Sequence, residues 1–199
     1  MSVLENASLL VTGGTGSFGK AFISYALENL NPRRVAVLSR DELKQSEMRA
    51  AFPDERMRWF LGDIRDRDRL TRAFHGVDYV VHAAALKHLT LLQRNPSEAH
   101  LTNVLGTQNV LHAASRSGVA AFINISTDKA ADPTSVLGAT KLMTERLTAS
   151  MKPQPTPFGP SRYLSVRFGN VLGSRGSVLT TFRYQIEKGG PLTVTHPDA

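Results

Sequence analysis

Short apolar runs alternate along the chain with longer stretches whose apolar residues follow a helical period. Six of the short runs are rich in β-branched residues and predict buried strands, at residues 8–12, 34–39, 57–62, 79–83, 121–126 and 163–168. The stretches between them predict helices at about 17–29, 41–51, 66–74, 96–117 and 136–152. Strands separated by helices of this length cannot form hairpins and need right-handed crossovers. The pattern therefore predicts an α/β fold with a doubly wound parallel sheet and helices on both faces.

The pattern changes after the last of these helices. Four prolines and a glycine within residues 152–160 predict a surface loop. After the sixth strand, residues 169–178 (GNVLGSRGSV) have the composition of a loop, and residues 180–188 predict a further helix. LTVT at 192–195 predicts a short strand close to the end of the chain.

A glycine-rich turn follows the first predicted strand and opens the first predicted helix. Gly13, Gly16 and Gly19 have the spacing GxxGxxG. In dinucleotide-binding folds the first glycine permits a tight turn, the second lets a pyrophosphate approach, and the third lets helix and strand pack closely. The N–H groups and positive dipole at the helix start then hold the phosphates. An ordinary glycine turn is the alternative, but the place of this turn in a βαβ unit favours a dinucleotide site.

Residues at the end of the second predicted strand bear on which dinucleotide is bound. An NAD site usually places a carboxylate there to bind the ribose 2′-hydroxyl, whereas here Ser39 and Arg40 come first and Lys44 follows one turn later. A hydroxyl and two cations suit a 2′-phosphate, because guanidinium matches phosphate oxygens in a bidentate fork. Asp41 is then expected to cap the next helix. We predict NADP; the alternative is a solvated basic surface with Asp41 on the ribose.

Two further strand ends offer contacts to the cofactor. Asp63 follows the third strand and is a candidate for the adenine amino group, with Ile64 against the ring. Ala83 follows the fourth strand and supplies a small side chain where the cofactor would cross the sheet. A small residue at this point also suits the packing of a helix on the sheet, so this signal is weaker than the glycine turn.

Longer motifs, spread over nearly the whole chain, are more specific. They are VTGGTGSFGKAF, SRDELKQSEM, GDIRD, VDYVVHAAALKH, NPSEAHLTNVLGTQNV, ISTDKAADP, LGATKLMTE, RFGNVLGSRGSV and LTVTHPDA. In this order they resemble the extended short-chain dehydrogenase/reductase superfamily, and within it the polysaccharide-biosynthesis branch of UDP-N-acetylglucosamine 4,6-dehydratases, which includes inverting enzymes. The resemblance implies a Rossmann-like NADP-binding domain over residues 1–168. It also implies that residues 169–199 begin a substrate-binding lobe which this chain leaves truncated, and that the protein is a homo-oligomer.

The resemblance also implies roles for single residues. Those it places against NADP are Thr15, Gly16, Ser17, Phe18, Ser39, Arg40, Lys44, Asp63, Ile64, Ala83 and Lys87. Lys141 corresponds to the lysine of the superfamily's Tyr-x-x-x-Lys pair, which holds the nicotinamide ribose. Lys87, Asn170 and Arg175 would face the nucleotide sugar, with Arg175 near its diphosphate.

Thr127, Asp128 and Lys129 occupy the place where sugar dehydratases carry a threonine, an acid and a base. In that chemistry, oxidation of the sugar at C4 makes a ketone that acidifies the proton on C5. A base removes this proton while an acid protonates the departing C6 hydroxyl, and the hydride then returns to C6. The resemblance makes Asp128 the acid and Lys129 the base of a lyase that uses NADP without consuming it.

The protonation state of Lys129 decides whether it can act as the base. At pH 7 a lysine with the ordinary pKa of about 10.4 is neutral in only about one molecule in 2,500. The site must therefore be dry and closed before Lys129 becomes a useful base. The alternative is that Lys129 only forms an ion pair with Asp128 at the end of the strand.

Three positions depart from the family pattern. Leu137 stands where the tyrosine of the Tyr-x-x-x-Lys pair belongs, and it has no proton to exchange. The removal of the proton from the sugar's 4-hydroxyl therefore passes to Thr127, Lys141, Lys129 or a water. The family also usually carries proline and glutamate where this chain has Thr90 and Gln93, which affects the substrate geometry beside Lys87.

Composition and charge then narrow the classes of partner. The chain carries 24 Lys and Arg against 17 Asp and Glu, a formal net charge of +7. Such a charge suits nucleic acid, an anionic membrane surface or phosphorylated ligands. Basic and acidic residues alternate over 63–72, which is typical of a solvated helix and argues against a nucleic-acid-binding stripe. We therefore expect a nucleotide-sugar substrate and no nucleic acid, with a non-catalytic NADP-binding module and a UDP-sugar 4-epimerase as alternatives.

Missing residue types and segments exclude further classes. The chain has no cysteine, so it has no disulfide, thiol catalysis or thiolate metal site. Its six histidines lack metal-ligand spacing, and no metal site is expected. No apolar run reaches the roughly 18 residues of a membrane span, and the first residues do not form a signal-peptide pattern. These features predict a cytoplasmic enzyme.

Overall fold

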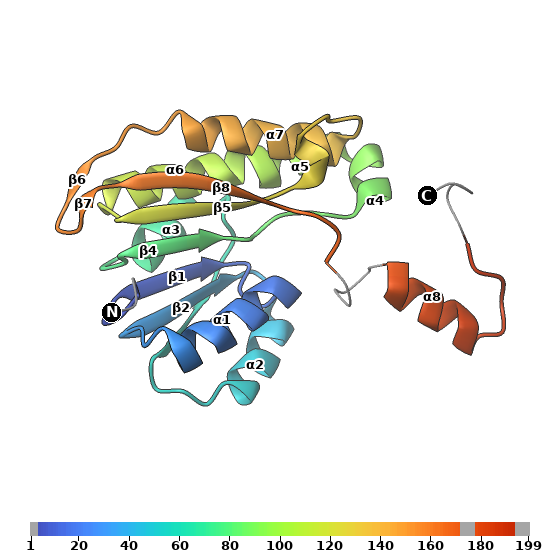
Figure 1. Cartoon of the computed structure of the whole chain (residues 1–199), viewed down its shortest axis with the longest axis horizontal. Coiled ribbons are helices and arrows are strands. Elements are labelled where there is room, and N and C mark those ends of the chain that lie inside the picture. The colour runs from blue at the N-terminus through green and yellow to red at the C-terminus, as the bar shows by residue number, and fades with distance from the viewer. Residues whose placement is uncertain (1–3, 172–177, 194–199) are drawn as a thin grey trace. The chain divides into compact units, whose positions relative to one another are not determined.

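A computed structural model describes residues 4–171 and 178–193 of the chain, which divides into two compact units, 1–167 and 168–199. A six-stranded sheet in the order β3-β2-β1-β4-β5-β8 is the centre of the first unit (Figure 1). Its strands are β1 (Ser8–Thr12), β2 (Arg34–Ser39), β3 (Met57–Leu61), β4 (Tyr79–His82), β5 (Ala121–Thr127) and β8 (Arg162–Phe168). The pairs of β1 with β2 and β4, of β2 with β3, and of β4 with β5 are parallel. The predicted doubly wound α/β fold is confirmed.

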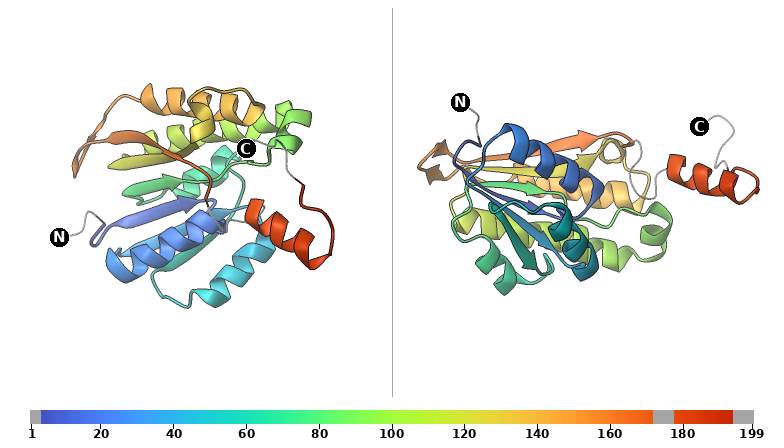
Figure 2. Two further views of the ribbon diagram at one scale, coloured as in Figure 1. Left: turned by 45° about the vertical axis from the view of Figure 1, so that its right-hand side comes forward. Right: turned by 90° about the horizontal axis from the view of Figure 1, so that it is seen from below.

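Helices cover both faces of this sheet (Figure 2). Helices α1 (Ser17–Asn29) and α2 (Glu42–Ala51) cover one face of the sheet. They form a hydrophobic core with the residues of β1 and β2 on that face, such as Leu9 and Val35. On the other face α3 (Arg67–Ala73) and α6 (Gly106–Arg116) pack on alternate residues such as Leu10. α7 (Val136–Ala149) lies on this second face (Figure 1). The alternation follows from the two-residue period of a strand, and it explains why these strands are apolar throughout.

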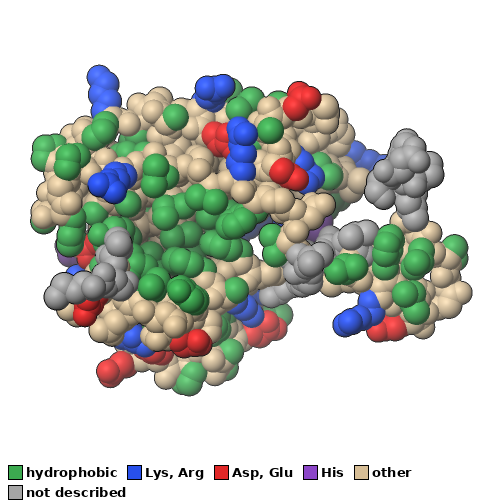
Figure 3. Space-filling view, in the orientation of Figure 1, with side chains coloured by type: hydrophobic (Ala, Val, Ile, Leu, Met, Phe, Trp, Pro, Cys, Tyr) green, Lys and Arg blue, Asp and Glu red, His purple; other side chains and the backbone are tan. Residues whose placement is uncertain are grey.

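The edge strand β8 differs from the inner strands in the exposure of its apolar side chains. It exposes Leu164 and Val166, whereas β1 is buried along its whole length. Figure 3 has the same orientation as Figure 1 and shows hydrophobic side chains gathered on this face of the molecule. In the described part of the chain, no helix is both long enough and apolar enough to cross a membrane.

The predicted helix over 96–117 is divided into three parts. It consists of α5 (Pro96–Ala99), six residues of π-helix (η1, His100–Leu105) and α6. Within the π-helical turn, the Asn103 side chain accepts a hydrogen bond from Leu86 N at 2.8 Å and donates to Leu86 O at 3.1 Å. It also donates to Thr140 Oγ1 on α7 at 3.2 Å. The wider turn therefore places an amide that holds the loop after β4 against α7.

Other segments also differ from the predictions. α4 (Leu89–Arg94) and the short 3₁₀ turn η2 (Asp128–Ala130) were not predicted. The predicted loop at 152–160 contains a small hairpin of β6 (Pro155–Thr156) and β7 (Gly159–Pro160).

The second unit contains α8 (Val178–Glu187), close to the predicted helix. The predicted strand at 192–195 is wrong for Leu192 and Thr193, because the N–H of Thr193 donates to the Gln185 side chain at 3.1 Å and not to a neighbouring strand. The other two residues of that prediction lie outside the described part of the chain.

His82, at the end of β4, is fully buried between two hydroxyl groups. Its Nδ1 lies 2.6 Å from Thr12 Oγ1 on β1, and its Nε2 lies 2.9 Å from Thr107 Oγ1 on α6. Burial, together with the positive charge of Lys141, lowers the pKa of His82 to about 3. This histidine is therefore a neutral link between two strands and a helix.

The neutral state of His82 predicts an acid-sensitive fold. Between pH 6.5 and about 3 the unfolded chain binds a proton at this position and the folded chain does not. The free energy of unfolding is then expected to fall with pH in this window by up to about 1.4 kcal/mol per unit from His82 alone. Urea titrations of the wild type and His82→Gln between pH 7 and 4 measure this, and the variant should lose the extra slope. Equal slopes in the two proteins would contradict the prediction.

Candidate functional site

The glycine turn after β1 is shaped so that no side chain fits inside it. Gly13 has a φ of +68°, and a Cβ there would lie 2.7 Å from Ala84 N. A Cβ on Gly19 would lie 2.5 Å from the Cα of Gly14. Gly16 is the N-cap of α1, no side chain hydrogen-bonds to this cap, and the first turn of the helix has no acidic residue. The turn thus brings a backbone without bulky side chains to the start of a helix, which fits the pyrophosphate of a dinucleotide.

At the end of β2, hydroxyl groups and an ion pair surround the predicted ribose site. Ser39 Oγ lies 2.9 Å from Thr15 Oγ1 of the glycine turn, and both side chains are buried. Asp41 caps α2 by accepting a hydrogen bond from Lys44 N at 3.0 Å, as predicted, and it also pairs with the Lys44 ammonium group. Its carboxylate is therefore engaged by the start of its own helix.

The end of β3 is tied to the end of β2 by charges. Asp63 accepts hydrogen bonds from the N–H of Arg65 at 2.9 Å and from its guanidinium at 2.9 Å, and it pairs with Arg40 at 3.6 Å. Burial tends to raise the pKa of Asp63, but the hydrogen bonds from Arg65 and the charge of Arg40 lower it further than burial raises it. Asp63 is therefore a carboxylate that holds Arg40 beside Ser39.

Other residues predicted to contact the cofactor lie at the same edge of the sheet. The side chain of Ile64 is almost fully buried and packs against Gly106. Ala83 follows β4 directly and its N–H donates to Thr12 O at 3.0 Å. Lys87 lies on the surface in the loop that Asn103 holds. Their contacts with a cofactor stay predictions.

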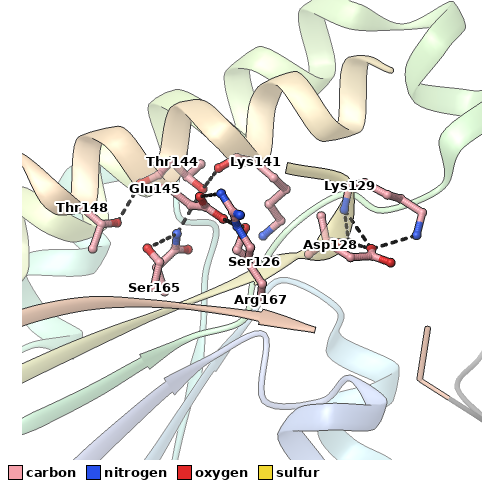
Figure 4. A network of polar contacts seen from close by, with 11 residues as sticks. Ser126, Asp128, Lys129, Lys141, Thr144, Glu145, Thr148, Ser165 and Arg167 are labelled. Atoms are coloured by element: carbon pink, nitrogen blue, oxygen red, sulfur yellow. Dashed lines mark hydrogen bonds and ion pairs between the residues drawn. The ribbon is translucent and has the colours of Figure 1, made fainter. Parts of the chain in front are cut away.

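Thr127, Asp128 and Lys129 form a compact polar turn where β5 ends and η2 begins (Figure 4). Thr127 Oγ1 donates to Asp128 Oδ1 at 2.8 Å, and Lys129 Nζ donates to the same oxygen at 3.1 Å. The hydrogen bond from Thr127, followed by those from Lys129, lowers the pKa of Asp128. The ion pair considered as the alternative role of Lys129 is therefore present in the structure.

Helix α7 packs directly on this turn and carries Lys141. A Cβ on Gly138 would lie 2.3 Å from Lys129 O, so only a glycine allows this approach. Lys141 is buried, and its Nζ donates to Ile125 O at 2.7 Å. Burial lowers the pKa of Lys141 to about 8, although the nearby charge of Glu145 acts to raise it.

The departures from the family pattern lie at the start of α7, for Leu137, and in helix α4, for Thr90 and Gln93. Leu137 is buried in a small apolar cluster with Leu92 of α4 and Ala99 of α5. Gln93 of α4 accepts a hydrogen bond from Val136 N through Oε1 at 3.2 Å and so caps the first turn of α7. At the position of the missing tyrosine, the Leu137 side chain therefore packs in an apolar cluster. The neutral amide of Gln93 binds the backbone at the start of α7.

Sequence reasoning missed three polar residues around Lys141. Ser126 and Arg167, from β5 and β8, both bind the carboxylate of Glu145, which is on α7 (Figure 4). The spacing of four residues between Lys141 and Glu145 places both on one side of a helix and could have pointed to this pair. Nothing in the local sequence indicates that Arg167 would join them.

The glycine turn, Ser39, the 127–129 turn and Lys141 all lie at the carboxyl ends of parallel strands or on the helices that follow them. Ligands of open α/β sheets bind at this edge. Asn170 belongs to the second unit, and Arg175 lies outside the described residues. Their predicted contacts with the substrate stay predictions.

Curated relatives of the chain include enzymes that act on nucleotide sugars. It is 45% identical over 200 residues to a Campylobacter jejuni protein named UDP-N-acetylglucosamine 4,6-dehydratase (inverting), with 97% of this chain and 58% of the relative covered. It is 43% identical over 193 residues to a Rickettsia canadensis protein named UDP-glucose 4-epimerase, with 96% and 56% covered. An uncharacterized membrane protein of Methanocaldococcus jannaschii is 50% identical, with 98% and 58% covered. The chain thus spans a little over half the length of these relatives.

Solved structures agree with the fold. Pen from Bacillus thuringiensis matches with a TM-score of 0.90 and 42% identity over 98% of this chain and 59% of the other. A dTDP-glucose 4,6-dehydratase from Streptomyces venezuelae, with NAD bound, matches with a TM-score of 0.64 and 30% identity over 70% of this chain and 50% of the other. The family model described as polysaccharide biosynthesis protein matches residues 9–199. The chain therefore belongs to the polysaccharide biosynthesis protein family.

Proposed function

We propose that the protein is a nucleotide-sugar 4,6-dehydratase that binds NADP and acts on UDP-N-acetylglucosamine. The observation that carries the proposal is the close packing of the 127–129 turn, with its candidate acid and base, against α7, the helix that carries the buried Lys141. The name of the Campylobacter jejuni relative supports the substrate, and the bound NAD of the Streptomyces venezuelae enzyme supports a nicotinamide dinucleotide. A cytoplasmic location and a homo-oligomer are also part of the proposal, and the homo-oligomer rests on the family resemblance.

The residues at the carboxyl edge of the sheet are suited to hold NADP. The turn at 13–19 would bind the pyrophosphate through its N–H groups, and Ser39, Arg40 and Lys44 would bind the 2′-phosphate. When bound, NADP supplies the reversible oxidation of the sugar at C4 and the reduction at C6. Lys141, whose ammonium group is held by Ile125 O, would bind the nicotinamide ribose.

Lys141 is also our candidate for the group that removes the proton from the 4-hydroxyl, because Leu137 cannot. With a pKa of about 8, Lys141 is neutral in roughly one molecule in ten at pH 7. An ordinary lysine is neutral several hundred times less often. Burial therefore makes this lysine a usable base in the place of the missing phenol.

The ion pair of Asp128 and Lys129 can be converted to the catalytic forms by exclusion of water. In a dry site both charges are disfavoured, so the proton of the Lys129 ammonium passes to the Asp128 carboxylate. The result is a neutral amine that can accept the C5 proton and a carboxylic acid that can protonate the C6 hydroxyl. The closure of the site over the sugar would thus produce the acid and the base together.

The rival function is a UDP-sugar 4-epimerase, which the Rickettsia canadensis relative supports. Mass spectrometry of UDP-N-acetylglucosamine incubated with the purified protein and NADP separates the two. The dehydratase yields a product lighter by one water with no net NADPH. A product of unchanged mass indicates the epimerase, and stoichiometric NADPH indicates a dehydrogenase; either result would overturn the proposal.

The cofactor preference has its own test in Arg40. Arg40→Ala is expected to weaken NADP binding by about 10- to 100-fold, because a charge-assisted phosphate contact contributes about 1.5–3 kcal/mol. Binding of NAD, which lacks the 2′-phosphate, should change little. Calorimetric titration of both dinucleotides measures this, with Arg49→Ala on the exposed end of α2 as the matched control. An equal loss for both dinucleotides would contradict the role of Arg40.

A further inference from the structure

Polar side chains connect α7 to the last two strands of the sheet. Asn124 and Ser126 are two residues apart on β5 and therefore point to the same face, towards α7. Asn124 Nδ2 lies 3.1 Å from Thr144 Oγ1 of α7 and 3.3 Å from Ser165 Oγ of β8. We call these contacts, with those of Glu145 below, the α7 polar interface (Figure 4). Because hydrogen bonds need defined distances and directions, this interface fixes the position of α7 more narrowly than apolar packing does.

The Glu145 carboxylate is the most heavily bonded group of the interface. Ser126 Oγ donates to Glu145 Oε1 at 2.5 Å. Arg167 donates to both oxygens, from Nε at 2.9 Å and from Nη2 at 2.7 Å. This bidentate contact is the geometry in which guanidinium and carboxylate bind most strongly. The hydrogen bond from Arg167 is the main cause that lowers the pKa of Glu145.

Lys141 lies one helical turn before Glu145, at the end of this interface. Its ammonium group donates to Ile125 O, and Ile125 directly precedes the Ser126 that binds Glu145. Two neighbouring residues of β5 therefore hold a cation and an anion of the same helix face. A negative charge at this spacing acts on a buried ammonium with little screening by water.

We propose that Glu145, fixed by Ser126 and Arg167 one helical turn after Lys141, is a positioning residue whose negative charge sets the acid–base behaviour of the Lys141 ammonium at the end of β5. This inference rests on the proposed function only in assigning Lys141 a catalytic task. Because Arg167 binds both oxygens of Glu145, its positive charge offsets part of the negative charge that acts on Lys141. A lysine fully paired with Glu145 would hold its proton too tightly to act as a base.

Other charged groups around Lys141 do not replace Glu145 in this role. His82 on β4 is neutral, because burial and the charge of Lys141 lower its pKa to about 3. On η2, Asp128 and Lys129 pair with each other. Of the charged groups near it, Glu145 is the one whose charge clearly shifts the pKa of Lys141.

The test measures the pKa of Lys141 directly, by NMR of isotope-labelled lysine side chains assigned with the Lys141→Met variant. Glu145→Gln keeps an acceptor for Ser126 but removes the charge, and should lower the Lys141 pKa by about one unit. Arg167→Gln leaves the Glu145 charge uncompensated and should raise it by about one unit. In the double variant the value should return to that of Glu145→Gln, because Arg167 acts through Glu145.

Arg162→Gln, at an exposed position near the other end of β8, is the matched control and should leave the Lys141 pKa unchanged. Arg167→Lys keeps the charge and replaces Arg167→Gln if that variant fails to fold; its shift should be smaller and upward. Shifts in the same direction for Glu145→Gln and Arg167→Gln, or no shift in either, would overturn the inference. If the shifts occur but UDP-N-acetylglucosamine is not converted, the role of Glu145 stands and the proposed function is wrong.

Discussion

Replacing Lys129 by methionine is expected to lower kcat by about 10²- to 10⁴-fold, the usual contribution of a general base, while NADP binding stays intact. The methionine side chain has similar length but cannot accept the C5 proton. Stopped assays with UDP-N-acetylglucosamine and calorimetry with NADP measure the two quantities on the same protein. Lys152→Met, which changes an exposed lysine after the end of α7, is the matched control.

Exchange of the C5 proton with solvent distinguishes the role of the acid from the role of the base. In D₂O, substrate recovered from Lys129→Met should carry no deuterium at C5, because the base is missing. Asp128→Asn should release no water, because the acid is missing, and its exchange at C5 should be slower than in the wild type, because Lys129 then lacks the carboxylate that takes up its proton. Full activity of either variant, or C5 exchange in Lys129→Met, would contradict the assigned roles.

Replacing Lys141 by methionine is expected to abolish activity and yet to raise the free energy of unfolding at pH 7 by about 2.5 kcal/mol, after the loss of one hydrogen bond is counted. The Lys141 pKa is about 8 in the folded protein against an ordinary value of 10.5, and each unit corresponds to about 1.4 kcal/mol. Below pH 8 the folded protein carries this charge in an unfavourable place. As the pH rises from 8 to 10.5, the folded protein has lost the proton while the unfolded chain still holds it, so the stability of the wild type rises.

Urea titrations of wild type and Lys141→Met from pH 6 to 10.5 test this result. The difference between them should be constant up to about pH 8 and should disappear towards pH 10.5. The loss of the hydrogen bond to Ile125 O offsets part of the gain, by about 1 kcal/mol. A variant that is less stable than the wild type at pH 7, with no dependence on pH, would show that Lys141 is a structural residue.

The parts of the fold that depend on local pattern were predictable from the sequence. The strands β1 and β2 match their predicted bounds, because a parallel strand buried on both faces is a continuous apolar run. The glycine turn and the cap of α2 by Asp41 were also predictable, because each depends on the conformation of a few adjacent residues. The 192–195 strand failed because a strand needs a partner, and the N–H of Thr193 has the Gln185 side chain instead.

Contacts between adjacent residues of the candidate site could be anticipated from the sequence, but contacts between distant residues could not. The ion pair of Asp128 with Lys129 was one of the alternatives considered, because the two residues are neighbours in the chain. The π-helical turn at Asn103 and the bond between Arg167 and Glu145 depend on residues far apart in the chain. The periodic pattern of apolar residues carries information about residues within one helix or strand. Contacts between residues of different elements depend on how the elements pack, so the pattern does not predict them.

The most direct test of the proposed function uses UDP-N-acetylglucosamine with deuterium at C4. In a dehydratase the hydrogen taken from C4 is returned to C6 of the same sugar, so the 4-keto product should carry the deuterium in its new methyl group. NMR of the product locates the label. Deuterium at C4 of a product with the substrate's mass, or deuterium in released NADPH, would contradict the account.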